Sequence, residues 1–382
     1  MKAALIGSGF IGPVHVEALR RIGVEVGGIL DATPELAQKA ASALGIEKVY
    51  DTLDKLLADG DTQSVHITSP NRYHFEQASA ALDAGKHVIC EKPLAMTSAQ
   101  SAKLAAQAAA SDLVAAVNYN LRFYPLCIEA RERVRSGGLG KVMAITGSYV
   151  QDWLLYETDY NWRVLADEGG ELRAVSDIGT HCLDLLGFIT GEEIVSVMAD
   201  LVTVHPVRKR PLGEVETFSG KGQNAPPATE NIDITTEDFG TILLRFKNGA
   251  RGSLTVSQVT AGRKNCLRFE IAGANHAMAF NSESPNALWM GYREKPNEVM
   301  LRDPSLLSEQ AAAFANYPGG HNEGFPDTFK QHWTEIYRHI RAGRKPEAPL
   351  YATFDDGHRE LLLCDAIAES NRLGQWVDVK EV

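Results

Sequence analysis

The sequence predicts two domains: an α/β domain with a parallel sheet, followed by an α+β domain that contains antiparallel hairpins. Three observations support this prediction. The chain has 382 residues, which exceeds the usual size of a single domain. Up to about residue 120, short apolar runs alternate with helical patterns, as in βαβ units. Beyond that point, runs of β-type sequence separated by short turns dominate. We predict domains at residues 1–121 and 122–382, with the last helix packing back near the first domain.

In the first domain, helix signals separate the expected strands. Thr33 is placed to cap a helix that starts with Pro34. Thr97 and Gln100 form a capping box before an Ala-rich helix, and Gly85 is placed to end the preceding helix. The expected strands are residues 2–6, 25–30, 64–68, 87–90 and 113–118.

In the second domain, we expect helices at residues 125–135 and 177–189, with a strand at 141–150 between them. The segment 205–238 is rich in Gly, Pro and polar residues, and we interpret it as a long excursion between strands. The expected hairpin strands are residues 241–246, 252–259, 267–272 and 276–280.

The composition is that of a globular protein, with 44% apolar and 23% charged residues. Acidic residues outnumber basic ones by 49 to 38, which argues against nucleic acid as a partner. No apolar stretch is long enough to span a bilayer, and the apolar start is interrupted by Gly7 and Gly9 with no cleavage site after it. We therefore expect a cytoplasmic protein with no membrane partner. The five cysteines are far apart and form no CxxC pair, so neither a disulfide framework nor a metal site is predicted.

The sequence GSGFIG at residues 7–12 is a GxGxxG motif between an expected strand and an expected helix. Here the first glycine permits a tight turn, the second lets the backbone approach a pyrophosphate, and the third lets helix and strand pack closely. Asp31 ends the second strand, where its carboxylate can bind an adenosine ribose. Because residues 30–38 contain no Arg or Lys to meet a 2′-phosphate, we predict NAD rather than NADP. The alternative is a glycine-rich turn without a ligand. The cofactor-binding residues predicted from this motif are Gly7, Gly9, Phe10, Ile11, Gly12 and Asp31.

Two further motifs lie at the carboxyl ends of expected strands, TSPNRYH at residues 68–74 and EKPLA at 91–95. In an open α/β sheet, this edge is where ligands bind. Lys92, if held near a nicotinamide, could exchange a proton with a substrate hydroxyl. A lone lysine in a loop is more often solvated, so that alternative stays open on these residues alone.

Together with NYNLRFYP at residues 118–125, NWR at 161–163 and SDIGTHCLD at 176–184, these motifs resemble the glucose-fructose oxidoreductase, inositol dehydrogenase and MocA family of nicotinamide enzymes. The resemblance covers essentially the whole chain. It implies that the second domain is an open, mostly antiparallel sheet whose face covers the nicotinamide. It also implies that Lys92, Asp177 and His181 are catalytic and that cofactor contacts extend to Ser69, Pro70, Asn71, His74, Glu91, Lys92 and Asn120.

The chemistry of these three residues agrees with that implication. Asp177 and His181 are spaced i, i+4, so on a helix they share one face. A histidine that titrates near neutrality suits the removal of a hydroxyl proton while hydride leaves the same carbon. Asp177 can bind the substrate or orient the imidazole, and Lys92 can stabilise a developing alkoxide. Without the resemblance, the same spacing is more often an exposed pair.

Aromatic and polar residues near these motifs suit a polyhydroxylated ring, which is apolar on its C–H faces and polar at its rim. Trp162 is favoured over Trp153 for this role, and core packing is the alternative for both. The predicted substrate-binding residues are Lys92, Tyr119, Arg122, Trp153, Trp162, Arg163, Asp177 and His181.

The predicted function is an NAD-dependent oxidoreductase that transfers hydride between nicotinamide and a ring secondary alcohol of a sugar, glycoside or cyclic polyol. One alternative is a glycosidase that oxidises its substrate transiently, eliminates the aglycone and re-reduces the product. Another is a non-catalytic dinucleotide sensor, against which the presence of Lys92, Asp177 and His181 argues.

A homodimer or homotetramer is expected through the sheet of the second domain, because alternation in residues 241–246 and 253–256 is read as apolar on both faces. The alternative is that the terminal segments or residues 205–238 cover the outer face. The basic run at residues 208–210 is either a solvated turn or an anion site.

Overall fold

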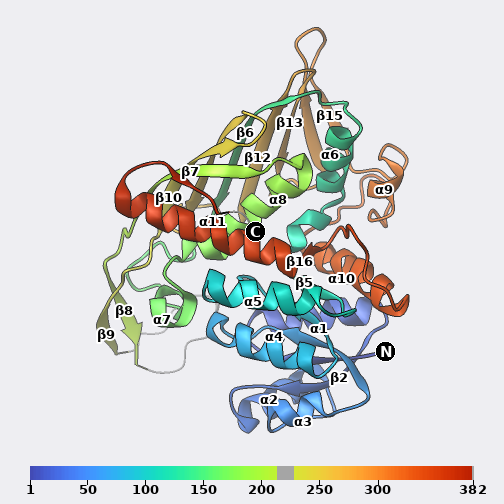
Figure 1. Ribbon diagram of the computed structural model, residues 1–382, viewed down its shortest axis with the longest axis vertical. Coiled ribbons are helices and arrows are strands. Elements are labelled where there is room, and N and C mark those ends of the chain that lie inside the picture. The colour runs from blue at the N-terminus through green and yellow to red at the C-terminus, as the bar shows by residue number, and fades with distance from the viewer. Residues whose placement is uncertain (213–227, 381–382) are drawn as a thin grey trace. The chain divides into compact units, whose positions relative to one another are not determined.

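The computed structural model describes residues 1–212 and 228–380, and it divides into two compact units (Figure 1). Unit 1 comprises Met1–Asn120 and Pro326–Leu361. Unit 2 comprises Leu121–Phe325 and, among the described residues, 362–380. The expected boundary near residue 121 falls where the first of these segments ends. Pro326–Leu361, which the sequence assigned to the second domain, belongs to unit 1.

Unit 1 is built on a six-stranded sheet in the order β16-β5-β4-β3-β1-β2. Strands β1 to β5 run parallel to one another, whereas β16 pairs antiparallel with β5. The predicted parallel α/β domain is therefore confirmed. The strands are β1 (Lys2–Ile6), β2 (Glu25–Leu30), β3 (Thr62–Ile67), β4 (His87–Cys90), β5 (Ala115–Val117) and β16 (Ala352–Thr353), and the helices are α1 (Ile11–Arg21), α2 (Pro34–Leu44), α3 (Leu53–Leu57), α4 (His74–Asp83), α5 (Ser98–Ala109) and α10 (Phe325–Arg341).

The helix boundaries of unit 1 follow from local side-chain chemistry. The Thr33 hydroxyl accepts a hydrogen bond from the backbone N–H of Leu36 at the start of α2. Thr97 caps α5 in the same way, although the Gln100 side chain bonds the N–H of Met96 rather than that of Thr97. Gly85 follows α4 with φ +71°, a left-handed conformation that favours glycine.

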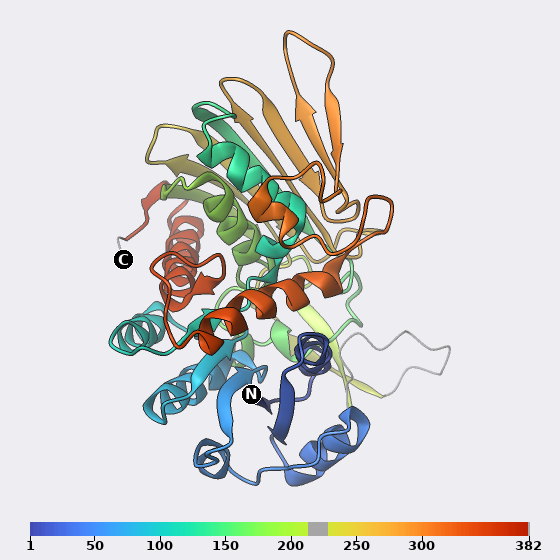
Figure 2. The same ribbon diagram turned by 90° about the vertical axis from the view of Figure 1, so that its right-hand side faces the viewer.

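Unit 2 is built on a nine-stranded sheet in the order β15-β14-β13-β12-β6-β11-β10-β7-β17. All neighbouring strands are antiparallel except β6 and β11, so the predicted α+β domain with a mostly antiparallel sheet is confirmed. Helices α6 (Pro125–Arg135) and α8 (Thr180–Thr190) lie on the same side of this sheet (Figures 1 and 2). The strands are β6 (Val142–Val150), β7 (Ile194–Val202), β10 (Phe239–Phe246), β11 (Arg251–Ser257), β12 (Cys266–Gly273), β13 (Ala277–Asn281), β14 (Ala287–Gly291), β15 (Glu298–Leu301) and β17 (Val377–Asp378).

Shorter elements complete unit 2. The excursion expected at residues 205–238 contains an antiparallel pair, β8 (Val207–Pro211) and β9 (Thr229–Asp233), and its central residues lie outside the described part of the chain. The helices α7 (Ala166–Gly169) and α9 (Glu309–Ala312) are short, and the long α11 (Phe354–Leu373) begins in unit 1 and ends in unit 2.

The outward face of the nine-stranded sheet is more polar than the sequence suggested. Leu254 and Val256 point into the core, whereas Ser253 and Thr255 alternate with them on the other face. In β10 only Leu243 exposes a large apolar side chain, at 45%. The prediction of apolar residues on both faces therefore holds in β10 only at Leu243, and it is wrong for β11, whose outward positions include Arg251, Ser253 and Thr255. This face holds a groove of about 630 Å³ that contains none of the candidate catalytic residues and is lined by Thr146, Ser148, Ser253, Thr255, Arg268, Glu270, Trp289 and Val299, among others.

All five cysteines are buried as free thiols, as the sequence predicted. Within residues 1–212 and 228–380, no helix combines the length and the apolar character that crossing a bilayer requires.

Candidate active site

The glycine motif forms a tight turn between β1 and α1. Gly7 has φ +92°, and a Cβ added there would lie 2.8 Å from the backbone nitrogen of Ser69. A Cβ on Gly12 would lie 2.6 Å from the carbonyl oxygen of Gly7. At Gly9, by contrast, an added Cβ would meet no atom within 4 Å. The first and third glycines thus permit close packing, and the second leaves the open space that a pyrophosphate needs.

Asp31 lies at the end of β2, next to this turn. Its Oδ2 accepts a hydrogen bond from the backbone N–H of Ser8 at 2.7 Å and another from the Ser8 hydroxyl. Its Oδ1 accepts from the N–H of Ala32. The carboxylate is therefore fixed beside the glycine turn, which is the arrangement that ribose binding requires. Phe10 is exposed just before α1, and Ile11 begins that helix.

The loops after β3 and β4 are tied together by His74. Its Nδ1 lies 2.7 Å from the carbonyl oxygen of Pro93, and its Nε2 lies 2.9 Å from that of Ser69. The Ser69 hydroxyl in turn donates to Gln77. Lys92 is half-buried in the second loop, and Pro70 and Asn71 are half-buried at the start of the first. His74 is thus a residue that holds the two predicted cofactor loops in place.

Glu91 points into the interior of unit 1. Its Oε1 lies 3.0 Å from His15 Nε2 and accepts a hydrogen bond from the Asn118 amide. His15 Nδ1 lies 3.0 Å from His66 Nδ1, and His332 Nδ1 lies 3.2 Å from Asn118 Oδ1. Burial by itself would raise the pKa of Glu91, but the hydrogen bond and charge of His15 outweigh burial and lower it to about 2. A buried polar network, which no sequence motif indicated, therefore supports the residue that precedes Lys92.

Asp177 lies in a π-helical turn, Val175–Gly179, that runs directly into α8. The sequence predicted an ordinary helix there, and π-turns are rare features that often occur at functional sites. A Cβ on Gly179 would lie 3.1 Å from Val256 Cγ1, so glycine lets this turn approach β11 closely. His181 follows in the first turn of α8 and is 8% exposed.

The side chains of Gln258 and Arg163 contact the Asp177 carboxylate. Gln258 Nε2 donates to Asp177 Oδ2 at 2.8 Å, and Arg163 Nε lies 3.5 Å from Oδ1. The Arg163 guanidinium also lies over the Trp162 ring, 4.4 Å from its centre. The Asn161 side chain accepts hydrogen bonds from the backbone N–H and Nη1 of Arg163. The NWR motif and Asp177 are therefore brought together, as the sequence-based assignment of Trp162 and Arg163 requires.

The His181 imidazole contacts Tyr149, which belongs to a second group of hydrogen-bonded residues. The Tyr149 ring lies edge-on to the imidazole, with centres 6.2 Å apart. Burial raises the pKa of the Tyr149 hydroxyl, which donates to Asn265 Oδ1 at 2.6 Å. Gln151 also donates to Asn265 and accepts a hydrogen bond from the Trp153 indole. Trp153 is thus hydrogen-bonded through Gln151 and Asn265 to Tyr149, whose ring contacts His181, a link that the sequence did not reveal.

Three further predicted residues are buried. Arg122 is buried in a bidentate ion pair with Asp184 of α8, with Nε 2.8 Å from Oδ2. The Asn120 amide donates to Thr328 Oγ1 at 2.6 Å, and Tyr119 is buried in unit 1.

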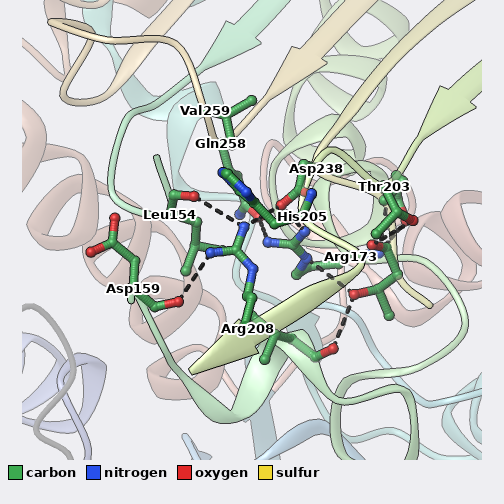
Figure 3. Close-up of polar contacts among 12 residues, drawn as sticks. Leu154, Asp159, Arg173, Thr203, His205, Arg208, Asp238, Gln258 and Val259 are labelled. Atoms are coloured by element: carbon green, nitrogen blue, oxygen red, sulfur yellow. Dashed lines mark hydrogen bonds and ion pairs between the residues drawn. The ribbon is translucent and has the colours of Figure 1, made fainter. Parts of the chain in front are cut away.

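The basic run at residues 208–210 is neither a solvated turn nor an anion site. Arg208 is 0% exposed and donates to Asp238 and to backbone carbonyl oxygens, including those of Leu154 and Asp159 (Figure 3). Its two neighbours form ion pairs with glutamates, Lys209 with Glu157 and Arg210 with Glu230. The sequence could not show this, because the acidic partners are distant along the chain.

Comparison with known proteins gives consistent matches over both units. Residues 1–119 match a profile described as an oxidoreductase family with an NAD-binding Rossmann fold, and residues 127–278 match the GFO/IDH/MocA C-terminal domain. Levoglucosan dehydrogenase from Pseudarthrobacter phenanthrenivorans is 29% identical over 100% of this chain and 99% of its own. D-glucoside 3-dehydrogenase from Escherichia coli is 30% identical over 65% of this chain and 68% of its own. A solved structure of levoglucosan dehydrogenase in complex with NADH and levoglucosan has a TM-score of 0.87, with 29% identity over 100% of both chains.

Proposed function

The chain belongs to the GFO/IDH/MocA family of oxidoreductases, and from this premise we propose that it transfers hydride between NAD and a ring secondary alcohol of a sugar, glycoside or cyclic polyol. Family membership confirms the predicted NAD-binding Rossmann domain and the predicted class of enzyme. The ring alcohol as substrate is supported by similar proteins that are named as levoglucosan, D-glucoside and myo-inositol dehydrogenases.

The observation that carries the proposal is the arrangement around Asp177. Its carboxylate is held by Gln258 and Arg163, with the Trp162 indole stacked on Arg163, and His181 follows four residues later. A fixed carboxylate beside an aromatic face and a guanidinium suits a ring that carries hydroxyl groups. The side chains of this group therefore favour a carbohydrate-like substrate over an apolar one.

In the proposed reaction, His181 removes the proton of the hydroxyl group that is oxidised. Asp177 accepts a hydrogen bond from the substrate and orients it, and Lys92 of unit 1 stabilises the developing alkoxide. NAD, when bound, accepts the hydride from the same carbon. Glu91 and its buried network act indirectly, by holding the loop from which Lys92 extends.

We propose NAD rather than NADP because Asp31 is fixed beside the glycine turn, where its negative charge would repel a 2′-phosphate. Calorimetric titration with both dinucleotides tests this preference. Tighter binding of NADP would contradict it.

We also propose that the protein works in the cytoplasm and self-associates. All five cysteines are free thiols, which agrees with a reducing compartment. Self-association through the outward sheet face is supported by the groove there and by the exposed side chains of Leu243, Val299 and Leu301.

The proposal is tested by the absorbance of NADH with a panel of inositols, anhydro-sugars and glycosides. We expect at least one of these substrates to give NADH in proportion to product, and His181→Ala to lower turnover by at least about a hundredfold. His321→Ala, which changes an exposed histidine of unit 2, is the matched control and should keep full activity. Near-normal turnover of His181→Ala would remove His181 from the proposed role.

A further inference from the structure

The hydrogen bonds around Asp177 continue through Gln258 to a buried cluster of charged residues in unit 2. We infer that Gln258 is a positioning residue that keeps Asp177 oriented as a hydrogen-bond acceptor, and that Arg173 fixes the direction of the Gln258 amide. The inference rests on the proposed function, because it assigns a support to the carboxylate that we place against the substrate.

The donors and acceptors along this path allow only one orientation of the Gln258 side-chain amide. Arg173 Nη1 donates to Gln258 Oε1 at 3.2 Å, and Gln258 Nε2 donates to Asp177 Oδ2 at 2.8 Å. A guanidinium can only donate, so the amide oxygen of Gln258 must face Arg173. The amide N–H groups then face Asp177, whose Oδ2 must accept. The arrangement therefore favours the ionised carboxylate at this oxygen and disfavours a proton there.

Arg173 is itself held by three consecutive residues. Its Nε donates to Thr236 Oγ1, its Nη2 pairs with Asp238 Oδ1, and its backbone N–H donates to the carboxylate of Glu237. Glu237 also accepts a hydrogen bond from the N–H of Val175, at the start of the π-turn. The segment that fixes the Arg173 side chain thus also caps the helical segment that carries Asp177.

Asp238 joins this arrangement to a second buried cation. Its Oδ1 accepts hydrogen bonds from Arg173 and from Arg208, which is 2.6 Å away (Figure 3). Its Oδ2 accepts from the backbone N–H of His205. Burial alone would raise the pKa of Asp238, but the charge and hydrogen bond of Arg173 and the charge of Arg208 outweigh it, so the pKa is lowered. Asp238 therefore stays ionised, and its ion pair holds the Arg173 guanidinium in the position from which it donates to Gln258.

Burial and a backbone hydrogen bond fix the position of Gln258. It is 0% exposed, and its backbone N–H donates to the carbonyl oxygen of Asp238 at 2.9 Å. The same residue that anchors Arg173 thus also anchors the main chain of Gln258. A purely structural role for Gln258 would not require a guanidinium on one side of its amide and a candidate catalytic carboxylate on the other.

Other charged and titratable groups also face Asp177. Arg163 approaches it from the NWR segment, Tyr149 from β6, and His181 lies one turn along in α8. Tyr149 is neutral at working pH, because burial raises its pKa. The positive charge of Arg163 and the N–H of Gln258 both favour the carboxylate form of Asp177, so loss of the Gln258 donor should shift its titration to higher pH.

The experiment compares two substitutions at Gln258. Gln258→Leu removes the donor, and Gln258→Glu keeps the size and the pairing with Arg173 but turns an acceptor toward Asp177. We expect kcat to fall about tenfold in Gln258→Leu, with the acidic limb of its pH profile about one pH unit higher. We expect a larger shift in Gln258→Glu, because like charges then face each other. The matched control is Thr203→Val, which removes one hydrogen bond to the Thr236 carbonyl at the edge of the cluster and should keep the wild-type pH profile.

A measurement that does not depend on enzyme turnover tests this inference independently of the proposed function. The carboxyl carbon of Asp177 is followed by ¹³C NMR in the cofactor-free full-length chain, with its signal assigned through Asp177→Asn. We expect a higher titration midpoint in both Gln258 variants and the wild-type midpoint in Thr203→Val. Unchanged midpoints in both folded Gln258 variants would overturn the inference, whether or not the wild-type protein oxidises a sugar. Shifted midpoints in the Gln258 variants, together with a wild-type protein that oxidises none of the panel, would support the inference and reject the proposed function.

Discussion

Glu91→Gln tests whether the buried network behind the Lys92 loop is held by charge. The substitution keeps the shape of the side chain and removes the negative charge that faces His15, 3.0 Å away. The structure lowers the pKa of Glu91 from 4.5 to about 2. At about 1.4 kcal/mol for each pKa unit, the ionised carboxylate stabilises the folded protein by about 3 kcal/mol at pH 7.

The sign of the pH dependence follows from the lowered pKa. A carboxyl group with a lower pKa in the folded state contributes stability above its unfolded pKa, and this contribution is lost as pH falls through the folded value. For Glu91 the loss runs from about pH 4.5 to about pH 2. At pH 3, roughly 1 kcal/mol of the contribution should remain.

Urea unfolding of the wild-type protein and of Glu91→Gln at pH 7 and pH 3, followed by circular dichroism, measures this difference. We expect the variant to be about 3 kcal/mol less stable at pH 7 and only about 1 kcal/mol less stable at pH 3. Glu47→Gln, at an exposed glutamate of unit 1, is the matched control and should differ little from wild type at either pH. Equal stability of Glu91→Gln and wild type at pH 7, or a difference that does not change with pH, would show that the charge of Glu91 does not stabilise the network.

Further substitutions test the cofactor site, the buried cluster and the assembly. Gly9→Ala should leave the melting temperature unchanged but weaken NAD binding at least about tenfold, because the added Cβ meets no protein atom and enters the space proposed for the pyrophosphate; unchanged affinity in a calorimetric titration would contradict that placement. Asp31→Ala should weaken NAD binding through the lost ribose bonds, and an unaffected affinity would argue against ribose binding by Asp31. Asp238→Asn should destabilise the protein by about 3–5 kcal/mol in urea unfolding, since Arg173 and Arg208 would lose the carboxylate they share; a loss below about 1 kcal/mol would mean that the cluster does not depend on charge. Light scattering should give a mass at least twice that of the 41.6 kDa chain, and a stable mass near 41.6 kDa would reject self-association.

The sequence predicts those parts of the fold that depend on local patterns. The turn at Gly7 and the helix caps at Thr33 and Thr97 are set by residues close in the chain, and the structure reproduces each of them. The π-turn at Asp177 could not be predicted, because SDIGTHCLD has the composition of an ordinary helix. Its close approach to β11, through Gly179, depends on a strand more than 70 residues later.

Sequence-based prediction of the candidate site has the same limit. Asp177 and His181 could be found from a motif, but Gln258 belongs to no motif and acts only through residues that folding brings beside it. Arg208 looked like part of a surface charge run, because its partner Asp238 is 30 residues away in the sequence. Buried polar networks of this kind depend on long-range geometry, which spacing along the chain does not encode.

In the proposed reaction, hydride moves directly from a ring carbon to NAD. The most direct measurement uses the best substrate of the panel, prepared with deuterium at the carbon that is oxidised, and analyses the NADH formed by mass spectrometry. We expect one deuterium in each NADH formed and a slower turnover than with the unlabelled substrate. NADH without deuterium, or release of an aglycone with no net NADH, would contradict it.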